Sequence, residues 1–258
     1  MINLLSRSRT CAALVAATSL GLATAALAQS SGMPAKNWTP TKLADGQPNM
    51  QGVYITGWGV PQERWTEQER KDFNAKMEAL RGPNPGAYGS EWSEPELHKD
   101  SYKPPPGTVM VIDPPDGKAP LQPWALAKRN YIREHWFEKP EYVDSRVRCL
   151  PAGPRHTFQS GYNGWQVIQT PGYVMILQEH NHNWRIIPIV KAGAPKPHVG
   201  SKIELWQGDS VGHWEGNTLV IEATNFTDKT WVLGEIGGEG MSVGTFHSQK
   251  LKMTERWT

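Results

Sequence analysis

The chain has 258 residues, 38% of them hydrophobic and 20% charged, with 25 glycines and 21 prolines. This composition excludes a disordered tail, a collagen-like fibre and a membrane protein with several spans. The formal net charge of +2 comes from Arg7 and Arg9, since residues 29–258 hold equal numbers of basic and acidic side chains. A chain without a concentrated positive charge gives no reason to expect nucleic acid or an anionic membrane surface as a partner.

Residues 1–28 have the features of a secretory signal peptide. Two arginines precede an apolar run that ends in Ala26-Leu27-Ala28, the small-x-small pattern of a cleavage site. The run is shorter than the about 20 residues that a membrane span needs, and polar Gln29 follows it. The sequence therefore predicts cleavage after Ala28, a periplasmic or secreted protein, and no membrane span after signal removal.

Cys149 is the only cysteine outside the predicted signal, so it has no partner for an internal disulfide. Arg148 lies next to it and would favour the thiolate, but a buried, inert thiol is the better-supported expectation. The fold must therefore be stabilised by its hydrophobic core alone, and a chain of this size can bury enough surface for that.

The segment 29–139 is expected to wrap around the rest of the protein, as part of the same domain. It is rich in proline and contains a strand signal at Gln51–Trp58. A capping box formed by Thr66 and Glu69 predicts a helix that ends at Gly82.

A second helix is expected over Trp124–Phe137. Between the two helices the chain is irregular, and its one strand-like piece is Thr108–Ile112. The apolar residues of the second helix that would form its buried stripe are Trp124, Ala127, Tyr131 and Ile132.

Residues 140–258 show an alternation of apolar and polar side chains that is typical of half-buried strands. Short turns such as Pro171-Gly172 and Gly216-Asn217 separate them, so neighbouring strands should be antiparallel. The sequence predicts a mainly β fold: a single antiparallel β-barrel or β-sandwich domain with a Pro-rich, partly helical N-terminal segment. The expected strands are Trp165–Thr170, Tyr173–Glu179, Trp184–Val190, Lys202–Gln207, Val211–Glu215, Thr218–Thr224, Lys229–Leu233 and Thr245–Trp257.

Three stretches of the chain, Val111–Pro120, Tyr162–Gly172 and Gly212–Val220, resemble a family of secreted bacterial proteins that usually carries the label "hypothetical". The W-E-G-x-T-L run inside the third stretch is the most specific of these similarities, which together cover about residues 105–258. The resemblance implies export and a β-rich body, and it implies no catalytic residues.

The chain departs from that family pattern in three ways. His213 stands where such proteins usually have arginine, and Ala192–Lys196 replaces an Asp-Gly-Arg turn. The chain also stops where relatives continue, so a site residue from a further segment would not be seen in it.

The densest polar cluster is Glu179-His180-Asn181-His182. If one long strand ran through it, His180 and His182 would share a face, as two histidine ligands of a zinc ion would. If it is the tip of a hairpin, both histidines are exposed loop residues. Strands average about 5 to 6 residues and asparagine favours turns, so the hairpin is the favoured interpretation and no metal is expected.

In the hairpin, Glu179 and Arg185 lie on adjacent strands and could form a cross-strand ion pair, either functional or a surface pair of little energetic weight. Glu179 continues the face of Tyr173 and Leu177, which predicts that its carboxylate points inward. An inward carboxylate could act as a general acid or base, because an apolar environment raises its pKa toward neutrality.

His247 alternates with Leu251 and Met253, which places it on the apolar side of its expected strand. A histidine there is more often a hydrogen-bonded core residue than a catalyst, yet it is the best candidate for proton transfer. Asp209 is a second acidic candidate, with turn capping as its alternative role. These groups would adjoin a cavity lined by Trp184, Trp206 and Trp214, chosen from the 12 tryptophans of the chain.

The sequence contains no phosphate-binding loop, dinucleotide fingerprint, nucleophile elbow or H-E-x-x-H motif, so no cofactor is expected. Arg155 and His156 could bind an anionic group of the substrate. The resulting hypothesis is a periplasmic, cofactor-independent lyase, isomerase or hydrolase that acts on a small hydrophobic, aromatic or glycosidic substrate. Two alternatives are a non-catalytic ligand-binding protein and a zinc-dependent hydrolase that uses His180 and His182.

Overall fold

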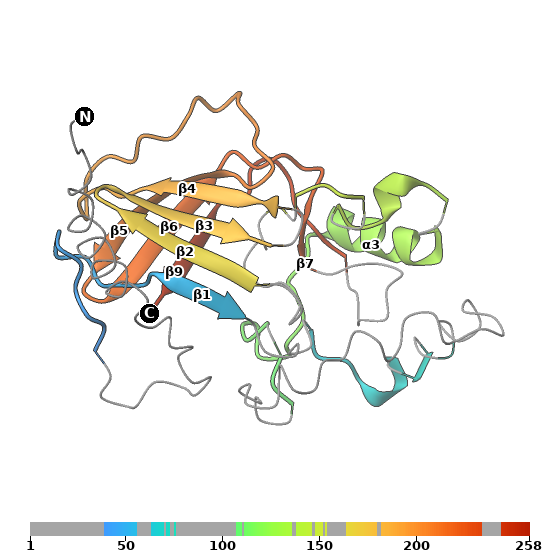
Figure 1. Cartoon of the computed structure of the whole chain (residues 1–258). Coiled ribbons are helices and arrows are strands. Elements are labelled where there is room, and N and C mark those ends of the chain that lie inside the picture. Colours follow the sequence, from blue (N-terminus) through green and yellow to red (C-terminus); the bar gives the residue numbers. More distant parts are fainter. Residues whose placement is uncertain are drawn as a thin grey trace, which may run out of the picture.

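The computed structural model of the chain is mainly β, with its strands in antiparallel sheets and one long described helix beside them (Figure 1). No helix in the described part of the chain is long and apolar enough to cross a membrane. The predicted signal peptide, residues 1–28, lies outside the described residues. The structure describes residues 39–55, 63–69, 71–72, 75, 107–109, 111–135, 138–145, 148–151, 153, 164–179, 182–233 and 244–258.

The larger sheet has four antiparallel strands in the order β1-β2-β3-β4. The Pro171-Gly172 turn joins β2 to β3, and Gly172 adopts a φ of 82° that glycine tolerates without steric cost. Since β1 belongs to the Pro-rich segment, that segment contributes a strand to the body of the domain. The strands are β1 (Gly52–Ile55), β2 (Gly164–Thr170), β3 (Tyr173–Gln178) and β4 (Trp184–Pro188).

The second sheet has three strands: β5 (Asp209–Glu215), β6 (Thr218–Thr224) and β9 (Met253–Trp257), in the order β5-β6-β9. Gly216 has a φ of 61°, which a two-residue hairpin with glycine first requires. The sequence therefore predicted this hairpin correctly, down to its turn residues.

The two sheets pack around one hydrophobic core, as in a sandwich, and the described strands do not close into a barrel. The sheets meet where Val190 donates its N–H to the carbonyl oxygen of Gly212 over 2.9 Å. A Cβ on Gly212 would lie 2.9 Å from Cδ1 of Ile189, so a larger residue there would have to displace the end of that side chain. The core consists of Val167, Val174, Ile176, Ile187, Leu219 and Ile221.

The outer face of the four-stranded sheet is exposed and apolar. Trp184 is 67% exposed, Ile186 55% and Tyr173 47%. On the opposite face of the same strands, Val174 and Ile187 are buried in the core.

A smaller hydrophobic cluster lies at one end of the sheets, where α3 (Pro123–His135) packs beside β7 (Trp231–Leu233) and β8 (Thr245–Phe246) (Figure 1). A short 3₁₀ helix, η2 (Pro140–Tyr142), follows α3. The cluster contains Ala125, Ile132, Trp231 and Phe246.

The predicted buried stripe of α3 is correct only for Ile132, which is buried, whereas Ala127 is exposed. Trp124 and Tyr131 are 48% and 52% exposed, and the buried face runs through Ala125 and Ile132. Arg129 lies between these two positions, and its guanidinium pairs with buried Glu63 at 3.2 Å. Arg129 can lie on the buried face because Glu63, from a distant segment, provides a carboxylate that pairs with its charge.

Two expected strands differ in the structure. Residues 202–207 form no strand but part of the loop before β5, in which Leu205 forms an isolated bridge with Phe226. The amide of Asn225 donates to three carbonyl oxygens of this loop, those of Val199, Gly200 and Ile203, so a side chain satisfies backbone groups that a sheet would otherwise bind.

The expected strand Thr245–Trp257 is divided into β8 and β9. A turn interrupts it, in which Leu251 donates its N–H to the carbonyl oxygen of Ser248 over 3.0 Å. At Thr108–Ile112 the described residues form no strand either.

The capping box is confirmed. The N–H of Glu69 donates to Thr66 Oγ1 over 3.1 Å, and the N–H of Thr66 donates to the Glu69 carboxylate over 2.7 Å. The described residues that follow, 67–69, 71–72 and 75, are helical, whereas the predicted end of this helix at Gly82 lies outside the described residues.

Candidate functional site

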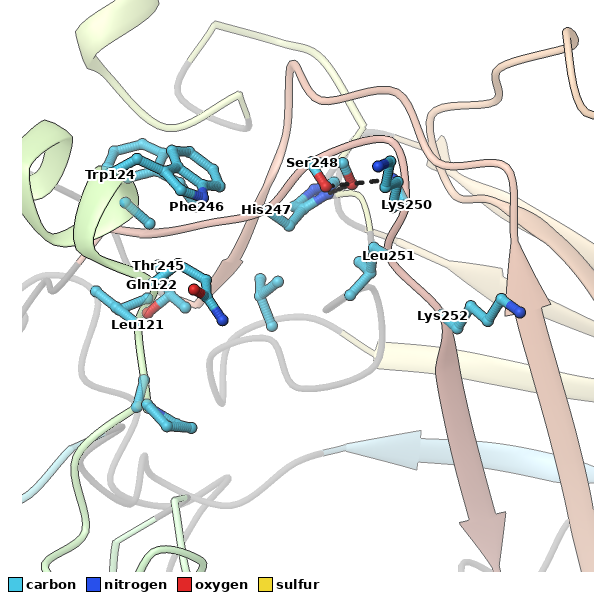
Figure 2. A pocket seen from close by; sticks show the side chains of 14 residues that line it. Leu121, Gln122, Trp124, Thr245, Phe246, His247, Ser248, Lys250, Leu251 and Lys252 are labelled. Atoms are coloured by element: carbon cyan, nitrogen blue, oxygen red, sulfur yellow. Dashed lines mark hydrogen bonds between the residues drawn. The ribbon is translucent and has the colours of Figure 1, made fainter.

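A pocket of about 460 Å³ opens between the start of α3 and the segment that contains β8 (Figure 2). Its walls come from two stretches that are far apart in the sequence, residues 119–125 and 245–252, with Val232 between them. A pocket of this size is in the range that binds small molecules. We take it as the candidate site because it also contains His247, the residue that the sequence singled out for proton transfer.

Aromatic side chains form one side of the pocket (Figure 2). The ring of Phe246 packs edge-on against Trp231, with 5.1 Å between the ring centroids. The ammonium of Lys128, one turn into α3, lies 4.5 Å from the centroid of the Phe246 ring, in cation–π distance. Trp124 lines the pocket from α3 and remains 48% exposed, so its indole is available to a ligand.

His247 is buried in the wall, and both of its ring nitrogens are hydrogen-bonded. Nδ1 lies 3.1 Å from the carbonyl oxygen of Ser248, to which it donates, and Nε2 lies 3.1 Å from the hydroxyl of buried Thr230. Burial lowers the pKa of His247 below its ordinary value near 6.5. The neutral imidazole therefore donates through Nδ1 and accepts the Thr230 proton through Nε2.

Thr245 lines the same pocket and is 7% exposed. Its Oγ1 is buried and has no hydrogen-bond partner among the residues that the structure describes. Burying a hydroxyl without a partner costs free energy, so a ligand that accepts a hydrogen bond from it would remove that cost.

The charge of the pocket lining is positive. Lys250 and Lys252 line it, and no aspartate or glutamate is among its lining residues. Asp228 affects the pKa values of both Lys128 and His247, but it is not part of the lining. Both lysines are exposed.

The tryptophans expected to line a cavity do not line this pocket. Trp184 is 67% exposed on the outer face of the larger sheet. Trp206 is half-buried in the loop before β5. Trp214 packs against the sandwich core and donates its indole N–H to Gln47 over 3.0 Å. The tryptophan of the pocket is Trp124, which the sequence had suggested for the buried stripe of a helix.

The prediction that Glu179 points inward is wrong. Glu179 does continue the face of Tyr173 and Leu177, but that face is the outer one, and the Glu179 carboxylate is exposed. It accepts the N–H of Gly164 over 2.8 Å and so ties the hairpin to the start of β2. Both faces of β3 are apolar, and alternation alone did not show which one is buried.

Arg185 does not lie at the surface, as a cross-strand surface pair with Glu179 would require, since its side chain is 4% exposed. Its guanidinium donates to both carboxylate oxygens of Glu255, over 2.8 and 3.2 Å, and to Ser210 Oγ over 2.7 Å. The indole of Trp257 donates to the same carboxylate over 3.2 Å. This buried network joins β4, β5 and β9 and is a structural link between the two sheets.

Strands β3 and β4 pair as an antiparallel hairpin, as predicted, and the described residues between them lie at its tip. His182 is exposed there with a φ of 50°, and the N–H of Gln178 donates to the carbonyl oxygen of Asn183 over 2.7 Å. His180 lies outside the described residues. Among the residues that are described, no group of three or more histidine, cysteine or acidic side chains could hold a metal ion.

Asp209 holds the loop that precedes its strand. Its carboxylate accepts the N–H of Val199 over 2.8 Å and lies 2.9 Å from Nδ1 of His198. This is the capping role that the sequence offered as an alternative to catalysis. Arg155 and His156 lie outside the described residues, and Cys149, expected to be buried, is exposed.

The pocket residues that sequence reasoning missed are Trp124, Thr245 and the two lysines. Only Trp124 gave a signal in the sequence, as a large aromatic residue in the first turn of a predicted helix. The other three take their role from a contact between segments more than a hundred residues apart.

Comparison with protein families, with curated proteins and with solved structures finds no match to this chain. The resemblance of the W-E-G-x-T-L run to a secreted family stays a prediction.

Proposed function

We propose that this protein is a periplasmic or secreted binding protein for a small, largely apolar and aromatic molecule, which it holds in the pocket between α3 and β8. The observation that carries this proposal is the combination in one pocket of an exposed indole, Trp124, with a buried hydroxyl, that of Thr245, for which the described part of the chain offers no hydrogen-bond partner. Ligand pockets are typically apolar with a few polar groups that orient the ligand. The signal-peptide pattern of residues 1–28 supports the location.

Binding is proposed ahead of acid–base catalysis because of the bonds that His247 makes. Each ring nitrogen already has a protein partner, Ser248 or Thr230. Proton exchange with a substrate would require one of these bonds to break. Thr230 is fully buried, so its hydroxyl is not positioned as a nucleophile either.

A fluorescence titration with N-phenyl-1-naphthylamine, a neutral aromatic probe, tests the proposal. We expect saturable binding at one site, and a loss of affinity of about tenfold in Trp124→Ala, since the removed indole would contribute about 1.4 kcal/mol or more to burial of the probe. The matched control is Trp184→Ala, which removes an exposed indole from the outer face of the larger sheet.

The control variant should bind the probe as the parent does. Absence of saturable binding, or equal losses in Trp124→Ala and Trp184→Ala, would show that the probe detects exposed apolar surface rather than the pocket, and the proposal would fail.

A further inference from the structure

We propose that the pocket selects small aromatic molecules that carry a carboxylate or sulfonate group, over neutral molecules of the same shape. This inference rests on the proposed function and adds the charge of the ligand. It is carried by three features of the pocket: the charges that line it, the end of the helix that faces it, and the hydroxyl buried in it.

The first feature is the imbalance of charge. Among the described residues of the lining, the charged side chains are Lys250 and Lys252, and none of them is a carboxylate. Lys128 adds a third ammonium against the outer side of the Phe246 ring. An anion in the pocket would meet only favourable charges in its walls, whereas a cation would meet repulsion.

The second feature is the N-terminal end of α3. Gln122, Trp124 and Ala125 line the pocket, so the first turn of this 13-residue helix forms part of the wall. The aligned peptide dipoles give a helix a partial positive charge at this end. No acidic residue occupies the first turn of α3 to satisfy it, although negative side chains are favoured there.

The third feature points to the ligand independently of charge. Thr245 is 7% exposed, lines the pocket, and has no hydrogen-bond partner for Oγ1 among the described residues. A threonine hydroxyl donates a stronger hydrogen bond to an ionised oxygen than to a neutral one. An oxyanion at this position would satisfy the hydroxyl while the lysines provide its counter-charge.

The pocket also has a place for an apolar body. Figure 2 shows Trp124, Phe246 and Leu121 on the side of the pocket opposite Lys250 and Lys252. A ligand with an aromatic ring at one end and an acidic group at the other matches this division. Small aromatic acids are the class of molecule with that shape and charge.

The test uses two probes that share one ring skeleton. Anilinonaphthalene-8-sulfonate differs from N-phenyl-1-naphthylamine by its sulfonate group, so the ratio of their affinities measures selection for the anion. We expect the sulfonate to bind about tenfold more tightly at low salt, and the preference to shrink at about 1 M salt as exposed charges are screened.

Two variants assign the preference to residues. Thr245→Val keeps the side-chain shape, and Lys250→Gln/Lys252→Gln removes both charges; each should lower the ratio of the sulfonate affinity to the neutral-probe affinity about threefold or more. Lys229→Gln is the matched control, because Lys229 is exposed but does not line the pocket.

The thermal stability of Thr245→Val separates binding from folding. The variant should be at least as stable as the parent, since no described residue bonds to the hydroxyl that is lost. A loss of anion affinity could then not be attributed to unfolding. Equal affinities for both probes in the parent, or a preference that survives all of these changes, would overturn the selection for anions and leave the binding proposal intact. Failure of both probes to saturate would overturn both proposals.

Discussion

His247 is of a residue type that often acts in catalysis, but here it stabilises the fold. Its position after β8, between Ser248 and Thr230, leaves neither nitrogen free. The sequence predicted its burial correctly, but for an incorrect reason, because the strand that was to place it on an apolar face ends at Phe246. Its burial comes instead from contacts with other segments, among them an edge contact with the ring of Phe226 at 6.1 Å between ring centroids.

Replacing His247 distinguishes the two roles. His247→Gln keeps some hydrogen bonding but pairs the buried partners imperfectly, so we expect a loss of about 1 to 3 kcal/mol in the free energy of unfolding. Ligand affinity per folded molecule should be unchanged. Urea unfolding and probe titration on the same preparation measure both quantities, and a variant as stable as the parent that no longer binds the probe would show that His247 serves the ligand rather than the fold.

At the scale of elements, the network of Arg185 and Glu255 links the two sheets. Arg185 extends from β4, Glu255 belongs to β9, and both side chains are almost fully buried. A buried charge that loses its partner is strongly destabilising, whereas loss of both charges together costs much less.

We therefore expect Arg185→Met to lower the free energy of unfolding by about 3 to 5 kcal/mol. The double variant Arg185→Met/Glu255→Leu should recover most of that loss, because no buried charge is left unpaired. Chemical denaturation of the parent, both single variants and the double variant forms a complete cycle. If the double variant were as unstable as the sum of the single ones, the pair would not be energetically coupled.

An element could be predicted from the sequence where neighbouring residues determine it, and could not where contacts with distant segments do. For β2, β5 and β6 the alternation and the turn residues are local, and the observed bounds differ from the expected ones by no more than two residues. For α3 the existence of the helix was local, but its buried face depends on Glu63, 66 residues away from Arg129. For β3 the two faces are equally apolar, so the buried one was decided only by the packing of the sheets.

The site could be predicted less well than the fold for the same reason. Its walls meet across more than a hundred residues, and none of the contacts between them follows a periodic pattern. The expected catalytic groups Glu179, Asp209 and His182 instead bind the backbone or lie at a hairpin tip. These polar residues stabilise turns and loops of the fold rather than forming a catalytic site.

At the scale of the whole molecule, the depressed pKa of His247 links folding to pH. Above about pH 6.5 the histidine is neutral in both the folded and the unfolded chain. As the pH falls through 6.5, the unfolded chain binds the proton first, because burial holds the folded pKa lower. Its contribution to stability is therefore full above that pH and is lost as the pH decreases toward the folded pKa.

We expect the melting temperature of the parent to fall between pH 7 and pH 5, with a smaller fall in His247→Gln. Scanning calorimetry in that window measures the difference. The carboxylates whose pKa is lowered, those of Glu69, Glu215 and Glu222, lose their stabilising contribution only as the pH falls below about 4.5, outside this window. Parallel curves for the two proteins would show that His247 does not control this dependence.

The pocket belongs to the smaller hydrophobic cluster, and none of its lining residues is part of the sandwich core. The core of Val167, Ile187 and Ile221 can therefore stay intact while α3 moves away from β8, an opening that would separate the two walls of the pocket. A ligand held between Trp124 and Leu251 would act as a non-covalent cross-link between two distant parts of the chain. Ligand binding would then order α3 against β8. The ligand concentration would set the fraction of molecules in which the two walls of the pocket are closed together.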